Sequence, residues 1–165
     1  MSEVKTVADA PKNSRSAARL VAVQALYEMD MVDADADQVL EEFLKKRWKI
    51  GGSSPVDGDA EAEMSEPEPA WLDELVHGVT SQRDALDGLI GPALSGEWTV
   101  ARLEALIRVI LRAGVYELKT KKKIPAAVII SEYLNVAHAF FEGKEPQLVN
   151  GVLDTIAREL RSGDS

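Results

Sequence analysis

A chain of 165 residues is long enough for one domain or at most two small lobes, and its hydrophobic content of 45% suffices for a packed core. The absence of cysteine excludes disulfides, a thiolate nucleophile and cysteine-ligated metal sites. The net charge of −9 argues at first against nucleic acid as a partner, because binding to phosphates needs a cationic surface.

The acidity is concentrated in one part of the chain. Residues 50–100 hold 11 acidic residues and one basic residue, whereas the remainder holds 17 acidic and 18 basic residues. Exposed charges are screened beyond about 8–10 Å at moderate ionic strength. Basic clusters outside the acidic segment can therefore act independently of the overall charge.

Targeting and membrane signals are absent from the sequence. The first 16 residues are polar and lack the apolar core of a signal peptide. No run approaches the roughly 18 apolar residues that a membrane-spanning helix needs. We therefore expect a soluble, cytoplasmic protein without a membrane partner.

The N-terminal region predicts a flexible tail over residues 1–12 and then a helix from about Ser14 to Asp30. Lys12, Arg15 and Arg19 form a cationic edge, and the two arginines lie four residues apart on one side of the helix. This edge has two interpretations, a solvated helix start or a binding surface. Positive charge at a helix N-terminus opposes the helix dipole by roughly 0.3–1 kcal/mol per charge, which favours a binding role.

The next segments are a second helix and an acidic insertion. The apolar spacing predicts a helix over residues 35–48 that ends in basic residues, which complement the helix dipole there. Residues 51–69 combine glycine, serine and proline with six carboxylates and no counter-charge. They lack the calcium-loop pattern of a glycine at position six and a glutamate at position twelve, so we interpret them as a solvated insertion.

A long helical region follows from Pro69 to about Leu94 and leads into the central helix. We expect the helical region after Pro69 to bend or break at Gly78, Gly88 or the Gly91-Pro92 pair. We expect Thr99 to cap the central helix. Residues 103–118 carry apolar side chains at three-and-four spacing, which indicates a helix in the middle of a bundle with one charged edge exposed.

Gly114 stands on the apolar face of that central helix. A glycine inside a helix costs roughly 1 kcal/mol relative to alanine, so it usually has a packing reason. We expect another helix to cross close to this position.

The C-terminal part predicts a basic turn and two further helices. Lys121, Lys122 and Lys123 follow the central helix, and Pro125 then fits the first turn of a helix that runs to about Phe141. The last helix spans about residues 146–161. No strand pattern competes with these helices, so the sequence predicts an all-α bundle of six or seven helices.

Catalytic patterns are absent. The two histidines, His77 and His138, are distant in sequence, and neither belongs to a zinc-binding HExxH motif. The sequence has no nucleophile elbow and no phosphate-binding glycine loop. We therefore expect no enzyme, no metal site and no cofactor.

Basic and aromatic residues indicate nucleic acid instead. Single-stranded RNA is typically bound by cationic grooves with aromatic side chains on which bases stack. Adjacent helical residues point about 100° apart, so one of two neighbouring phenylalanines can be a stacking platform while the other packs in the core. The candidate RNA-binding residues are Lys12, Arg15, Arg19, Lys121, Lys122, Lys123, Phe140, Phe141 and Lys144.

Three stretches together resemble the NusB family of transcription antitermination factors. They are RSAARLVAVQALY from Arg15, ILRAGVYEL from Ile110 and LVNGVLD from Leu148. Their order and spacing agree with the family over about residues 13–160, apart from the acidic insertion. The resemblance implies a single NusB-like domain over residues 13–162, built as two roughly perpendicular three-helix bundles.

The resemblance also implies a function. It implies binding of the boxA element of nascent RNA together with NusE, a small-subunit ribosomal protein, and loading of this complex onto RNA polymerase to favour read-through of ribosomal RNA operons. The family's RNA surface maps onto Arg15, Arg19 and the stretch from Phe140 to Asn150.

The sequence departs from the family at several of these positions. Ser16 and Ala17 replace further basic residues, and Gln147-Leu148 replaces a lysine and a phenylalanine. Lys144 and the lysine turn are candidates to compensate. For Asn150 we favour a buried structural role over RNA contact, and for Gly151 a close approach of a neighbouring helix.

Two other functions stay open. The chain can be a protein-interaction adaptor whose RNA affinity arises mainly in the NusE complex, with the exposed edge of the central helix, including Glu117, as the partner surface. NusB-like domains also precede catalytic domains in certain ribosomal RNA cytosine methyltransferases. We expect no such activity here, because 165 residues leave no room for a methyl-donor-binding sheet.

Overall fold

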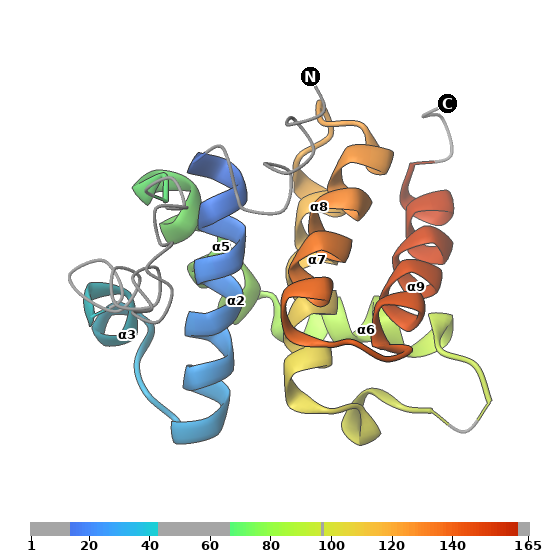
Figure 1. Cartoon of the computed structure of the whole chain (residues 1–165), viewed down its shortest axis with the longest axis horizontal. Coiled ribbons are helices and arrows are strands. Elements are labelled where there is room, and N and C mark those ends of the chain that lie inside the picture. The colour runs from blue at the N-terminus through green and yellow to red at the C-terminus, as the bar shows by residue number, and fades with distance from the viewer. Residues whose placement is uncertain (1–13, 43–66, 97, 162–165) are drawn as a thin grey trace. The chain divides into compact units, whose positions relative to one another are not determined.

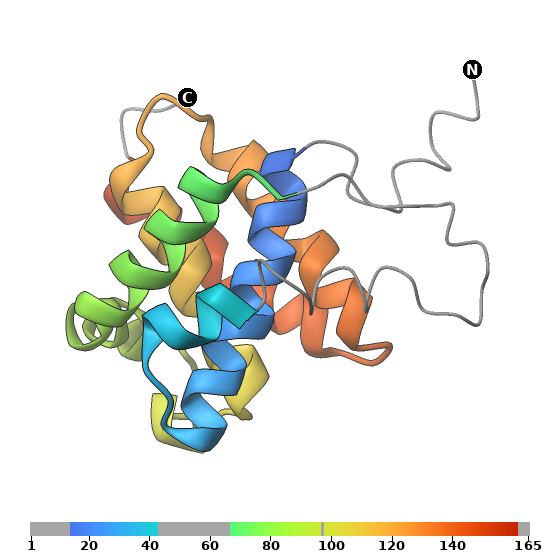
Figure 2. The same ribbon diagram turned by 90° about the vertical axis from the view of Figure 1, so that its left-hand side faces the viewer.

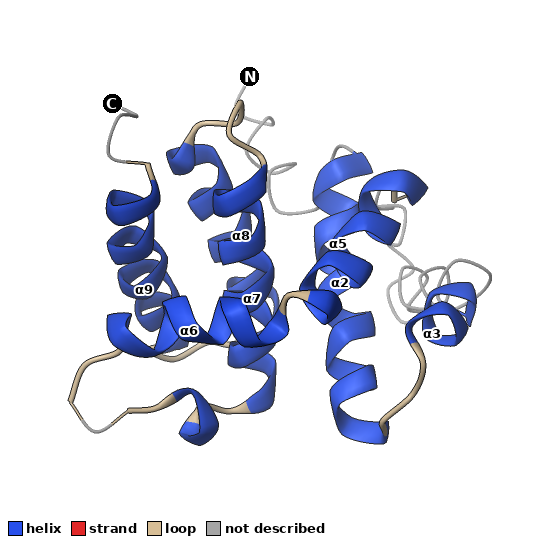
Figure 3. Cartoon of the chain, turned by 180° about the vertical axis from the view of Figure 1, so that it is seen from behind, coloured by secondary structure: helices blue, strands red, loops and turns tan. Residues whose placement is uncertain are grey.

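Helices make up all the regular secondary structure that the computed structural model describes, which covers residues 14–42, 67–96 and 98–161 (Figures 1 and 3). The predicted all-α class is confirmed. The N-terminal tail with Lys12, the end of the second predicted helix and nearly all of the acidic insertion lie outside these residues. The helices are α2 (Ser14–Val32), α3 (Ala36–Glu42), α5 (Pro69–Ser81), α6 (Arg83–Ala93), α7 (Ala105–Thr120), α8 (Ala126–Phe140) and α9 (Glu145–Leu160), with a 3₁₀ turn η3 (Val100–Arg102).

The chain divides into two compact units, residues 1–77 and residues 78–165. In the first unit, α3 packs against α2 (Figure 2). Alanine and valine side chains on α2, among them Ala18, Ala22 and Ala25, are fully buried. Leu72 and Leu75 of α5 are buried as well. Small side chains on α2 allow close packing of its neighbours, and the three-and-four spacing of both helices accounts for this core.

In the second unit, α7 lies at the centre and contacts α6, α8 and α9. Every residue from Val109 to Leu118 is buried. A Cβ placed on Gly114 would lie 3.0 Å from both methyl carbons of Leu153 on α9 and 3.5 Å from the ring of Tyr133 on α8. The expected close crossing at Gly114 is therefore confirmed, and two helices approach there.

The prediction that the central helix has an exposed charged edge is wrong for two of its residues. Arg112 is only 8% exposed, and its Nε and a terminal nitrogen donate to the two carboxylate oxygens of Asp87 at 2.7 and 2.9 Å. Glu117 is completely buried and accepts a hydrogen bond of 2.6 Å from the hydroxyl of Tyr133. Helices pack on several sides of α7, so charged residues outside its apolar stripe are also covered and need polar partners.

Two helix boundaries also differ from the prediction. The helical region after Pro69 breaks at Gln82, between α5 and α6, and not at a glycine or proline. Gly78 stays within helix α5, and it leaves room for the ring of Tyr116, which a Cβ at this position would overlap. Thr99 does not cap the central helix, because η3 intervenes and Glu104 is the residue before α7.

Candidate nucleic-acid interface

Arg15 lies at the start of α2 in the first unit, on the face of an aromatic ring. Its guanidinium carbon is 4.1 Å from the ring centroid of Trp71, and its Nε is 3.5 Å from Oε1 of Glu68. The Arg15 side chain is still 51% exposed. Glu68 is tied to the same helix end, because its backbone N–H donates to the carbonyl of Ser14 at 3.0 Å. This carboxylate offsets the unfavourable effect of a cation at the helix N-terminus.

Arg19 has a different environment from Arg15, one turn away. Its guanidinium carbon lies 5.6 Å from the centroid of Trp71, but the residue is only 4% exposed. The prediction that both arginines stand on an open cationic edge is therefore wrong for Arg19. Stacking against an aromatic ring lets an arginine be covered while it keeps a favourable electrostatic contact.

Lys121, Lys122 and Lys123 form the turn between α7 and α8 in the second unit. Lys122 and Lys123 are exposed, and Lys121 is partly covered. The backbone of this turn is held by Arg161, which follows α9 and is 7% exposed. Arg161 donates to the carbonyls of Leu118, Lys121 and Ile124 at 2.8–2.9 Å. One guanidinium thus satisfies the carbonyl of Leu118 in the last turn of α7 and also binds two carbonyls of the turn that follows.

Phe140, Phe141 and Lys144 lie at the junction of α8 and α9. Both phenylalanines are half-buried, so each keeps part of its ring surface open, and Lys144 is exposed immediately before α9. The backbone N–H of Phe141 donates to Ala137 at 2.9 Å, which closes the last turn of α8. Cation and partly open rings are therefore adjacent at this junction.

The lysine turn and the α8–α9 junction lie at opposite ends of α8 (Figure 1). Fifteen residues at 1.5 Å per residue separate them by about 22 Å. The structure thus brings Phe140, Phe141 and Lys144 together and keeps Lys121 to Lys123 apart from them. A single small ligand cannot contact both groups.

The first turns of α9 differ from the sequence-based interpretation. Asn150 is exposed and not a buried amide, and a Cβ on the exposed Gly151 would meet nothing within 4 Å. Both expectations were wrong for the same reason, because these residues lie on the side of α9 that faces away from α7 and α8. Gln147 is exposed on this side too.

Glu117 cannot serve as the partner surface that the sequence suggested. It has no exposed area and is bonded to Tyr133 inside the second unit. Periodicity gave no signal for this, because the residue lies outside the apolar stripe of α7 yet is covered by α8.

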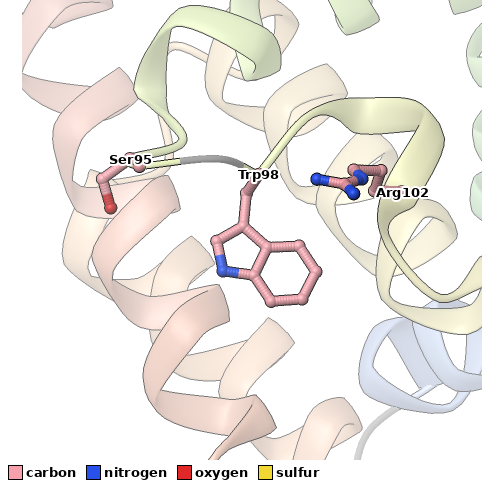
Figure 4. Close-up of a pocket in the computed structure, with 4 residues that line it drawn as sticks. Ser95, Trp98 and Arg102 are labelled. Atoms are coloured by element: carbon pink, nitrogen blue, oxygen red, sulfur yellow. The ribbon is translucent and has the colours of Figure 1, made fainter.

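Exposed aromatic surface occurs elsewhere in the second unit. Trp98 is 52% exposed and lines a pocket with Ser95 and Arg102, whose side chain extends toward Trp98 (Figure 4).

Trp71, Arg161 and Trp98 were all absent from the sequence-based site. The one available signal was for Arg161, a cation just after the last apolar position of a helix.

No helix among the described residues is long and apolar enough to cross a membrane. Within the same residues, no group of three or more histidine, cysteine, aspartate or glutamate side chains is arranged to hold a metal ion.

Comparison with known proteins decides the family. The model of the NusB family matches residues 16–158. The chain belongs to the NusB family. The resemblance carried by the three sequence stretches is thereby confirmed, and the match extends from the first turn of α2 to the last turn of α9.

Relatives and solved structures agree with this family. The chain is 44% identical over 164 residues to the transcription antitermination protein NusB of Nitrobacter hamburgensis, covering 99% of this chain and 98% of that protein. It is 43% identical to the protein of the same name from Rhizobium rhizogenes, covering 90% and 89%. The structure of T. maritima NusB superposes with a TM-score of 0.72 at 28% identity, covering 93% of this chain and 97% of that one.

Proposed function

We propose that this chain is a non-catalytic, RNA-binding transcription antitermination factor. The observation that carries the proposal is the near full-length match to proteins named transcription antitermination protein NusB, at 43–44% identity. The described residues agree with a binding role. Their exposed cations and partly open aromatic rings lie at helix ends, which suits contact with a polyanion.

The ligand that we propose is boxA RNA, bound together with NusE. Complex formation would load the pair onto RNA polymerase in the cytoplasm and favour read-through of ribosomal RNA operons. A chain of the same fold, with a TM-score of 0.68 and 22% identity, is one of the antitermination factors NusB and NusE solved in complex with double-stranded RNA. That complex supports the fold's ability to take both partners.

Among the candidate residues, we assign phosphate contact on α2 to Arg15. It keeps half of its side chain exposed while Trp71 and Glu68 hold it in place. Arg19 supports the same Trp71 ring from a covered position. At the other surface we assign base stacking to one of the half-buried rings of Phe140 and Phe141, and phosphate contact to Lys144.

A salt titration of RNA binding tests the assignment of Arg15. The variant Arg15→Ala should bind boxA RNA more weakly, and the slope of log affinity against log salt should decrease by roughly 0.7 unit, as one phosphate contact to a single strand is lost. Arg158→Ala is the matched control, because Arg158 is 76% exposed and paired with Asp154 on α9. Equal slopes for Arg15→Ala and the wild-type chain would reject the assignment.

The adaptor function is a second candidate, favoured by a specific observation. The net charge is −9, and burial of Arg19 removes one of the expected phosphate contacts from the chain. RNA affinity measured with and without NusE separates the two functions. Strong binding to boxA RNA by the chain alone rejects the adaptor, whereas binding only in the presence of NusE supports it.

A further inference from the structure

A basic hollow lies in the second unit where the junction of α5 and α6 meets the end of α7. Arg83 and Lys119 bring two cations to its lining, and Thr80, Ser81 and Thr120 bring three hydroxyls. The lysine turn follows directly after Thr120 in the chain. Five cations, including Lys121 to Lys123, therefore belong to one end of the unit.

A carboxylate-free contact that bears on the charge of the hollow is made by Lys119. Nζ of Lys119 donates at 2.8 Å to Oε1 of Gln82, which is an uncharged amide. Of the nearby carboxylates, Asp87 is engaged by Arg112, and Glu117 is completely buried. Asp84 is the one carboxylate among the described residues that line the hollow. The surface is thus cationic in a protein that is acidic overall.

The same surface is held in place before any ligand arrives. Gln82 fixes the end of the Lys119 side chain, and the hydroxyl of Thr120 donates to the carbonyl of Tyr116 at 2.7 Å. Arg161 binds three backbone carbonyls around the turn, so the lysine side chains project from a fixed backbone. A fixed cationic surface loses little conformational freedom when it binds a polyanion.

We propose that the hollow and the lysine turn form a second contact for RNA, which binds phosphates of the backbone and does not read bases. The inference rests on the proposed function and extends it. The lining offers cations and hydroxyls, which suit phosphate oxygens, and among the described residues it includes no aromatic ring on which a base could stack. Because the lysine turn lies about 22 Å from the α8–α9 junction, at the other end of α8, it contacts a different part of the RNA.

The double variant Arg83→Gln with Lys119→Gln tests the proposal, with Arg158→Gln as the matched loss of an exposed cation. Binding of a boxA RNA and of a scrambled RNA of equal length is measured over a salt series, with and without NusE. We expect the double variant to weaken the binding of both RNAs by a similar factor, about tenfold near 0.1 M salt. The slope of log affinity against log salt should decrease by roughly 1.4 units. A loss of affinity for the boxA RNA alone would overturn the proposal. So would a loss of affinity no larger than that caused by Arg158→Gln.

Protection of lysines gives a second readout on the unmodified chain. RNA should protect Lys119 and Lys121 to Lys123 from acetylation, measured by mass spectrometry, as well as Lys144. Protection of Lys144 alone would overturn the second contact and leave the proposed function standing. Absence of RNA binding by the wild-type chain, even with NusE, would overturn both.

Discussion

Gly114 and Gly151 are two helical glycines with opposite surroundings. The change Gly114→Ala places a methyl group 3.0 Å from both Cδ atoms of Leu153, which is fully buried. We expect the resulting overpacking, about 1–3 kcal/mol, to exceed the gain of up to about 1 kcal/mol in helix propensity. Urea denaturation should therefore show a lower free energy of unfolding. An unchanged or higher value would show that α9 can shift away from α7.

The change Gly151→Ala should have the opposite sign. A Cβ at this exposed position meets nothing within 4 Å, so only the helix propensity changes. We expect the free energy of unfolding to rise by up to about 1 kcal/mol. The same urea experiment measures it, and the two glycine variants act as controls for each other. A loss of stability would contradict the open environment of Gly151.

At the scale of elements, His77 connects α5 to α3. Its Nε2 lies 2.9 Å from Oδ1 of Asp37 on α3, and its Nδ1 lies 3.1 Å from the backbone carbonyl of Asp73. Burial lowers the pKa of His77, but the hydrogen bonds to Asp73 and Asp37 and the charges of both carboxylates outweigh it and raise the pKa above 6.5.

A raised pKa in the folded state means that protonated His77 stabilises the packing of α3. This contribution is fully present below the unfolded pKa of about 6.5 and is lost as the pH rises through the folded pKa. We expect His77→Gln to lower the thermal midpoint at pH 5.5 and to have less effect at pH 8.5. The difference should stay below about 1 kcal/mol, because His77 and Asp37 are 43% and 82% exposed and water screens the pair. Equal effects at the two pH values would contradict the pairing.

Arg161 joins α9 to the end of α7. Replacement by methionine leaves three backbone carbonyls without their charged donor, and we expect a loss of about 2–4 kcal/mol. Amide hydrogen exchange should also become faster around residues 121–124. Arg158→Met is the control, since Arg158 is 76% exposed and its loss should change stability by less than about 0.5 kcal/mol. Similar results for both variants would reject the role of Arg161.

At the scale of the whole molecule, apolar spacing predicted the helices and their buried faces well. It placed α2, α7, α8 and α9 close to their observed positions and explained Gly114. Spacing shows which face of a helix is apolar, but it does not show how many neighbours surround the helix. Arg19, Arg112 and Glu117 were therefore placed on open edges, although each is covered.

The sequence pattern also did not predict contacts between residues that are distant in the chain. Trp71 meets Arg15 across the acidic insertion, and Arg161 reaches Leu118 over 43 residues. Nothing in local composition marks either pair. The distance between the lysine turn and the α8–α9 junction follows from the length of α8 alone. It became evident only when the structure showed where both ends of that helix lie.

The hydrogen bonds between Arg161 and the backbone of the lysine turn can form only after Arg161 has been synthesised. Lys121 leaves the ribosome 40 residues before Arg161 does, which takes about 2–8 s at typical translation rates. Until then the carbonyls at the end of α7 lack their arginine donor, and the lysines project from a backbone that is not yet fixed. The cationic end of the second unit is therefore completed only after Arg161 has been made.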